Sequence, residues 1–106
     1  MNNVNISREQ YHDDTAQELA TSLLEDIREY FRNSGKGEAV ICSTAVDRLY
    51  TEIANRGAAA YTMQIQHRPD RMGVATVILY DARGSWRLVR VHTFKVVVRR
   101  TVPDAT

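Results

Sequence analysis

The chain has 106 residues, 43% of them hydrophobic and 25% charged, which are the proportions of a globular domain and exclude a disordered chain. We therefore expect one domain over residues 1–106, with residues 1–7 and 101–106 frayed. The net charge is +1, and no apolar run approaches the roughly 20 residues that cross a bilayer, so we expect no membrane-spanning segment.

Cysteine content and the first residues bear on the compartment. Cys42 is the only cysteine in the sequence, so no intramolecular disulfide can form. Residues 1–5 lack the basic and apolar regions of a secretory signal. A cytoplasmic location is the expectation that follows.

The clearest element is an amphipathic helix in the first third of the chain. Capping-box patterns occur at Ser7 and at Thr15, so the helix can begin at either point. Apolar residues then recur at steps of three and four up to Phe31, which predicts one apolar stripe on a helix ending near Asn33. The opposite, polar face carries six acidic residues: Asp13, Asp14, Glu18, Glu25, Asp26 and Glu29.

A second helix is predicted over residues 43–56. Apolar residues repeat there at helical spacing, and Gly57 follows at the position where a glycine ends many helices. The preceding segment, residues 38–42, suits either the first turns of this helix or a short strand.

The second half of the chain alternates as strands do. Residues 61–66 alternate apolar and polar side chains, and residues 67–73 have turn chemistry. Residues 74–80 are apolar on both faces, which is typical of a central strand covered on both sides. We therefore expect antiparallel strands in this half of the chain.

Residues 86–98 contain no turn residue, so one long bent strand is the preferred interpretation, with two strands as the alternative. The apolar parity changes twice, which predicts bulges or bends near residues 88–89 and 92–93. The predicted architecture is a two-layer α+β domain in the order ααβββ(β), with two N-terminal helices packed on a three- or four-stranded antiparallel sheet.

The sequence contains one motif that suggests catalysis. Cys42 is followed six positions later by Arg48, and this spacing resembles the phosphate loop of cysteine-dependent phosphatases and arsenate reductases. The segment has no glycine, and Asp47 places a negative charge in it, so we interpret Cys42 as a buried free cysteine. We expect a non-enzymatic protein without cofactor or metal, and a Cys-dependent phosphatase is the remote alternative.

Charge divides the chain into two candidate binding surfaces. Residues 1–60 carry six basic and ten acidic side chains, whereas residues 61–106 carry eight basic and three acidic ones. The acidic candidate is the outer face of the first helix, with Asp13, Asp14, Glu18, Glu25 and Glu29. The basic candidate is the last strand, with Arg83, Trp86, Arg87, Arg90, Lys95, Arg99 and Arg100.

These features favour a small binding protein that regulates or inhibits a larger assembly by stoichiometric protein–protein association. Two helices cover only one face of a sheet, so the other face is expected to meet a different protein or a second copy of the chain. Phage and mobile-element inhibitors of bacterial defence systems are one population with these traits. The alternative is a nucleic-acid-binding module that uses the basic strand.

Overall fold

The computed structural model describes residues 2–9, 15–68, 72–81 and 87–100. The elements follow one another as β1 (Asn2–Glu9), α1 (Ala16–Asn33), β2 (Glu38–Ile41), α2 (Ser43–Arg56), β3 (Ala60–His67), β4 (Met72–Asp81) and β5 (Arg87–Arg99). The α+β class is confirmed. The predicted order is wrong, because one strand precedes α1 and another separates the helices, and the sheet has five strands instead of three or four.

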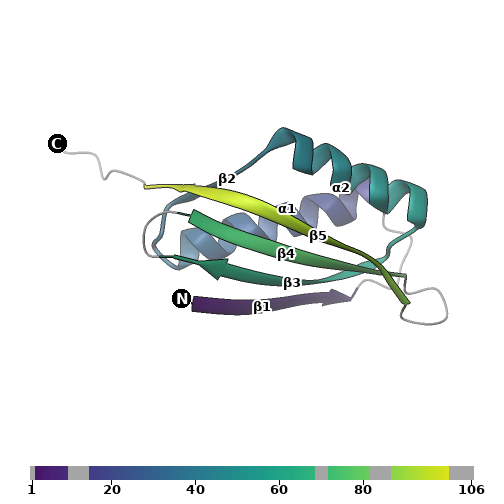
Figure 1. Ribbon diagram of the computed structural model, residues 1–106, viewed down its shortest axis with the longest axis horizontal. Coiled ribbons are helices and arrows are strands. Elements are labelled where there is room, and N and C mark those ends of the chain that lie inside the picture. The colour runs from purple at the N-terminus through teal and green to yellow at the C-terminus, as the bar shows by residue number, and fades with distance from the viewer. Residues whose placement is uncertain (1, 10–14, 69–71, 82–86, 101–106) are drawn as a thin grey trace.

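The five strands form one antiparallel sheet in the order β1-β3-β4-β5-β2. The two helices lie on the same side of this sheet, which gives two layers (Figure 1). Strand β4 occupies the centre of the sheet, so the prediction of a central strand at residues 74–80 is confirmed. The sequence also predicted that β4 is covered on both faces. The described elements cover only one of them.

Strand β1 corrects the expectation that the chain begins with frayed residues. Its described residues pair with β3 along their whole length, from Asn2 opposite His67 to Glu9 opposite Ala60. Asparagine has low intrinsic β propensity, but pairing and packing against a neighbouring strand outweigh that preference. Val4 and Ile6, which face the helix layer, supply part of this packing.

Helix α1 begins at the second of the two predicted starts. Thr15 is the N-cap, and its hydroxyl accepts a hydrogen bond of 3.2 Å from the backbone N–H of Glu18. The first predicted start, at Ser7, lies inside β1 instead. The predicted end of α1 and the limits of α2 are confirmed, and Gly57 ends α2 in the left-handed conformation with φ of 69°.

The hydrophobic core lies between the sheet and the helices. Most of its largest buried side chains come from α1, β3 and β4, and Leu49 of α2 and Val96 of β5 complete the set. They are at most 1% exposed and include Leu19, Leu23, Ile27, Phe31, Met63, Ile65 and Val77. This burial fixes α1 against one face of the sheet and leaves the opposite face outside the core.

Asp26 corrects the prediction that places it on the polar face of α1, because it is only 6% exposed. Arg8 donates two hydrogen bonds to its carboxylate, from Nε to Oδ2 at 2.7 Å and from Nη2 to Oδ1 at 2.6 Å. The Tyr61 hydroxyl donates another to Oδ2. Burial and the Asp26 carboxylate raise the pKa of Tyr61 well above its usual range, so the phenol stays protonated. This cluster joins β1, α1 and β3.

Strand β5 is one strand, as preferred, and the predicted bulge near residues 88–89 is confirmed. Leu79 pairs with Arg90 and Tyr80 with Leu88, so Val89 is the extra residue. The predicted second bend near residues 92–93 is wrong, because the register runs unbroken from Arg90 to Val97. The apolar alternation of the sequence changes there because Val91 is an apolar residue that lies on the face away from the helices.

Candidate functional site

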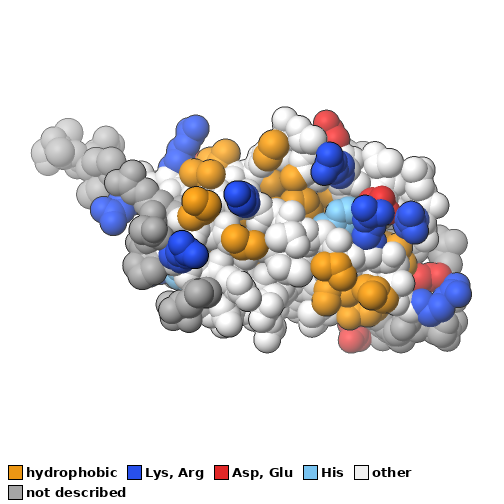
Figure 2. Space-filling model, in the orientation of Figure 1, with side chains coloured by type: hydrophobic (Ala, Val, Ile, Leu, Met, Phe, Trp, Pro, Cys, Tyr) orange, Lys and Arg blue, Asp and Glu red, His pale blue; other side chains and the backbone are white. Residues whose placement is uncertain are grey.

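The face of the sheet opposite the helices carries a group of aliphatic side chains. Met72, Leu88, Val91 and Val97 are between 48% and 59% exposed. Figure 2 shows hydrophobic side chains gathered toward both ends of this face. We call the group the aliphatic face and define it as Val40, Met72, Val74, Ile78, Leu88, Val91 and Val97.

Strand register brings these side chains together from distant parts of the sequence. Val97 of β5 pairs with Val40 of β2 on one side and with Met72 of β4 on the other. Farther along, Val91 pairs with Ile78. Strand spacing and rise give this three-stranded region an area of about 450 Å². Thr76, Thr93 and Lys95 lie within it, between its two apolar ends.

The other half of the same face is polar. It is formed by β1 and β3 and carries Asn3, Asn5, Ser7, Thr62, Gln64 and Gln66. Together the two halves measure about 800 Å², which equals about one partner's share of a standard protein–protein interface. A stable complex therefore requires contact with both halves.

The predicted basic strand is not gathered on one face. Lys95 and Arg99 lie on the same face as the aliphatic group, whereas Arg87 and Arg90 lie on the helix side. Arg90 also forms an ion pair of 3.4 Å with Glu52 of α2. The basic residues extend along a strand of 13 residues, about 40 Å, with the exposed Arg100 just beyond it. Two further members, Arg83 and Trp86, lie outside the described residues.

The predicted acidic face is partly brought together. Glu18, Glu25 and Glu29 are exposed, and their separations correspond to about two and three turns of α1, so they share one side of the helix. They lie in the helix layer, on the opposite side of the molecule from the aliphatic face. The remaining members of the prediction, Asp13 and Asp14, fall outside the described residues.

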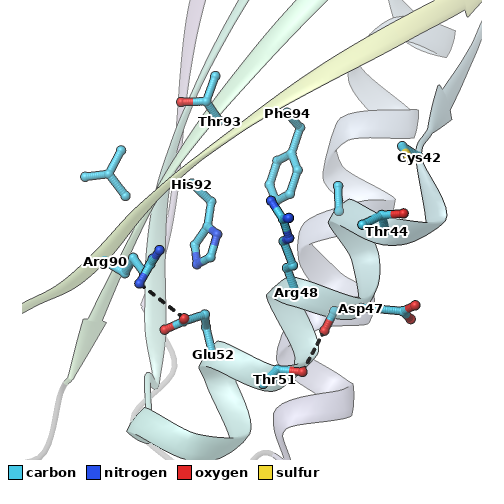
Figure 3. Close-up of a pocket in the computed structure, with 12 residues that line it drawn as sticks. Cys42, Thr44, Asp47, Arg48, Thr51, Glu52, Arg90, His92, Thr93 and Phe94 are labelled. Carbon is cyan, nitrogen blue, oxygen red and sulfur yellow. Dashed lines mark hydrogen bonds and ion pairs between the residues drawn. The ribbon is translucent and has the colours of Figure 1, made fainter.

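A groove of about 750 Å³ runs between α2 and β5 (Figure 3). Side chains from both faces of β5 contribute to it, so it follows the edge of the strand and not one face of the sheet. Its lining consists of Cys42, Thr44, Ala45, Asp47, Arg48, Thr51, Glu52, Arg90, Val91, His92, Thr93 and Phe94. No pattern in the sequence indicated this groove.

Two buried polar atoms in the groove lack a hydrogen-bond partner among the described residues, Oε2 of Glu52 and Nε2 of His92. The Nε atom of Arg56 lies 2.8 Å from Glu52 Oε2 but is not aligned for a hydrogen bond. Burial lowers the pKa of His92, which favours the neutral imidazole. Since Glu52 Oε2 is held in this ion pair with Arg56, Nε2 of His92 is the buried polar atom of the groove that has no partner among the described residues.

Cys42 is exposed, so its prediction as a buried cysteine is wrong. It is the N-cap of α2, and the helix begins directly at Ser43. The segment up to Arg48 is therefore helical and does not form a loop that could surround a phosphate. Cys42 makes no capping hydrogen bond, but the nearby backbone N–H groups of Thr44 and Ala45 favour the thiolate and lower the pKa of Cys42.

This environment predicts enhanced reactivity of Cys42. The rate of alkylation by iodoacetamide should rise with pH around a midpoint below that of the same thiol in the urea-unfolded chain, because unfolding removes the helix N–H groups. The reaction is stopped at successive times between pH 6 and 10, with and without urea, and mass spectrometry of the alkylated chain gives both midpoints. Equal midpoints would show that the start of α2 does not influence the thiol.

Within the described ranges, neither helix combines the length and apolar character needed to cross a membrane. The described His, Cys, Asp and Glu side chains form no group of three or more that could hold a metal ion. Comparison with known proteins found no matching family model, no similar curated protein and no similar solved structure.

Proposed function

We propose that this protein is a non-enzymatic binding protein that regulates or inhibits a larger assembly by docking its aliphatic face on a folded partner protein. The observation that carries the proposal is the exposure of aliphatic side chains at both ends of one sheet face, which none of the described elements covers. Single exposed apolar side chains are ordinary on protein surfaces. Several apolar side chains on one exposed face, bordered by polar residues, are typical of an interaction site.

Charge on this face indicates the chemistry of the partner. Lys95 lies opposite Val74, in the middle of the aliphatic face, and Arg99 lies opposite Glu38 at its end. A partner with an apolar patch flanked by carboxylates would bury the aliphatic side chains and pair with Lys95. The amide and hydroxyl side chains of β1 and β3 suit the hydrogen-bonded rim of such an interface.

The same face supports protein over nucleic acid as the partner. Sheets that bind single-stranded nucleic acid combine basic side chains with aromatic side chains on which bases stack. On the described part of this face Tyr80 is the one aromatic residue, and the others near it are aliphatic. Two of the strand's cations, Arg87 and Arg90, lie on the other face. Nucleic-acid binding is therefore the less favoured function.

A charge placed in the aliphatic face should disrupt partner binding. Val97→Lys is expected to lower the affinity for the partner at least tenfold, because the new ammonium group would be desolvated between Val40 and Met72. The partner is first captured from nuclease-treated lysate with the wild-type chain. Its affinity for each variant is then measured by calorimetry.

Asn55→Lys provides the matched control, because it adds the same charge to the helix layer, where Asn55 of α2 is exposed. Its effect should stay within about threefold, and both variants should keep the wild-type circular dichroism spectrum. If Val97→Lys binds as tightly as Asn55→Lys, the aliphatic face is not the docking surface. Light scattering of the chain alone tests the second-copy alternative, for which a dimer dissociated by Val97→Lys is the expected result.

A further inference from the structure

The groove beside β5 contains an unpaired edge of the sheet. Strand β2 pairs with β5 only from Ile41 opposite Val96 to Glu38 opposite Arg99. On that side, residues 87–95 of β5 have no strand partner among the described residues. An unpaired edge presents a row of backbone N–H and C=O groups that can pair with another extended chain.

We propose that this groove binds the C-terminal segment of a partner protein as an added strand beside β5, with the terminal carboxylate near Arg48. The site adjoins the aliphatic face that carries the proposed function, and Val91 belongs to both. Recognition would combine backbone hydrogen bonds along the edge with side-chain contacts on either side of it.

The shape of the groove suits one extended chain. Residues 90–94 of β5 line it, with Arg90, His92 and Phe94 from one face of the strand and Val91 and Thr93 from the other. The backbone edge between these two sets is therefore accessible from within the groove. Five strand residues span about 17 Å, which accommodates a peptide segment of about five residues.

A buried polar atom of the groove supports a peptide as the occupant. Nε2 of His92 can bond to a peptide group in either of its tautomers, whereas Oε2 of Glu52 already forms an ion pair with Arg56. Buried polar atoms without a partner are rare in folded proteins, because each costs about 1–3 kcal/mol. An added strand would bring N–H and C=O groups to this part of the molecule.

The closed end of the groove determines which part of a peptide it accepts. Strand β2 occupies the edge of β5 from Val96 onward, so an added strand must end or turn away beside Lys95. The start of α2 lies at this end, where Thr44 and Ala45 line the groove. A chain terminus can stop there without a turn, which favours a C-terminal segment over an internal one.

Charge at the closed end favours the C-terminus over the N-terminus. Arg48 projects from α2 toward β5 and forms no ion pair with the described residues (Figure 3). The amino end of α2 adds the positive end of the helix dipole. Both attract a carboxylate and repel an ammonium group, and Asp47, which also lines the groove, opposes them. A peptide with its C-terminus at this end runs parallel to β5.

A second copy of the chain does not suit the same edge. Helix α2 lies past β5 on the side where an added strand would pair (Figure 1). A second sheet joined edge to edge would bring its own α2 into the same space. A single extended segment avoids this clash.

The test is selection from a random heptapeptide library displayed with free C-termini, followed by fluorescence polarisation of the selected peptides. We expect enrichment of peptides whose affinity falls at least tenfold when the C-terminus is amidated, and at least tenfold with Arg48→Glu. N-methylation of alternate peptide residues should abolish binding for one parity and not for the other. That alternation is the signature of strand pairing.

Arg32→Glu is the control, because Arg32 is an exposed arginine on α1 outside the groove, and its effect should stay within twofold. The absence of any enriched peptide would overturn the proposal. Selected peptides that bind the Arg48→Glu variant or bind as amides with unchanged affinity would also overturn it. Val97→Lys should leave peptide binding intact, so failure of this site and failure of the aliphatic face are distinguishable.

Discussion

Asp26→Asn is expected to lower the free energy of unfolding by about 2–3 kcal/mol. The carboxylate accepts two hydrogen bonds from Arg8 and one from Tyr61, and it is 6% exposed. The asparagine side chain keeps one acceptor oxygen, but its NH2 group would face a hydrogen-bond donor of Arg8 or Tyr61. We place the effect below that of breaking a fully buried pair, because the Arg8 side chain is 47% exposed and can turn to water. Urea denaturation measures the change.

Glu25→Gln is the matched control for this prediction, since Glu25 precedes Asp26 on α1 and is exposed. Its effect should stay within about 0.5 kcal/mol. Adding Tyr61→Phe to Asp26→Asn should cost less than Tyr61→Phe alone costs in the wild-type chain, because the two groups share one hydrogen bond. Full additivity, or equal effects of Asp26→Asn and Glu25→Gln, would contradict this account of the cluster.

Gly37→Ala is expected to destabilise the protein by at least about 3 kcal/mol and to loosen β2. Gly37 has φ of 119°, and a Cβ atom at this position would lie 2.0 Å from the carbonyl oxygen of Arg99. Because the obstructing atom belongs to the backbone, the clash can be relieved only by separating the chain before β2 from β5. Amide hydrogen exchange of residues 38–41, together with urea denaturation, measures the effect.

Gly35→Ala separates the steric effect from the conformational one. Gly35 also has positive φ, 68°, but nothing lies within 4 Å of the added Cβ atom. Its cost should be about 1 kcal/mol, the ordinary penalty for a non-glycine residue in this region. If Gly35→Ala and Gly37→Ala cost the same, the contact with Arg99 is not the cause.

Helices could be predicted from the sequence because their signals are local. The limits of α2 depended on apolar spacing and on Gly57, and the start of α1 depended on a capping pattern at Thr15. The bulge at Val89 was also predictable, since an extra residue changes which face the following apolar side chains occupy. Each of these signals lies within a few residues of the feature it specifies.

Strand β1 and the groove could not be predicted, because both depend on contacts between distant residues. The alternation in β1 is weak, with only Val4 and Ile6 as apolar residues, and its partner β3 lies more than 50 residues later. Asp26 resembled its exposed neighbours because no local signal marks a carboxylate that meets Arg8 across the layers. The unpaired edge of β5 exists because β2 is short and pairs with one end of it.

The aliphatic face was only partly predictable. The apolar residues on both faces of β4 indicated a second buried surface, but the contributions of Val40 and Val97 depend on the pairing of β2 with β5. The charge counts indicated two surfaces of opposite sign, and the structure brings together three members of the acidic one, Glu18, Glu25 and Glu29. Strand parity, which changes at Val89, divides the basic residues between two faces.

Hydroxyl-radical footprinting of the chain, free and bound to the captured partner, tests the central claim most directly. Docking through the aliphatic face predicts lower labelling of Met72 and Leu88, which are 49% and 59% exposed in the free chain. Labelling of Tyr50 on α2, outside that face, should stay unchanged. Unchanged labelling of Met72 and Leu88 in a stoichiometric complex would contradict the proposal and place the interface elsewhere.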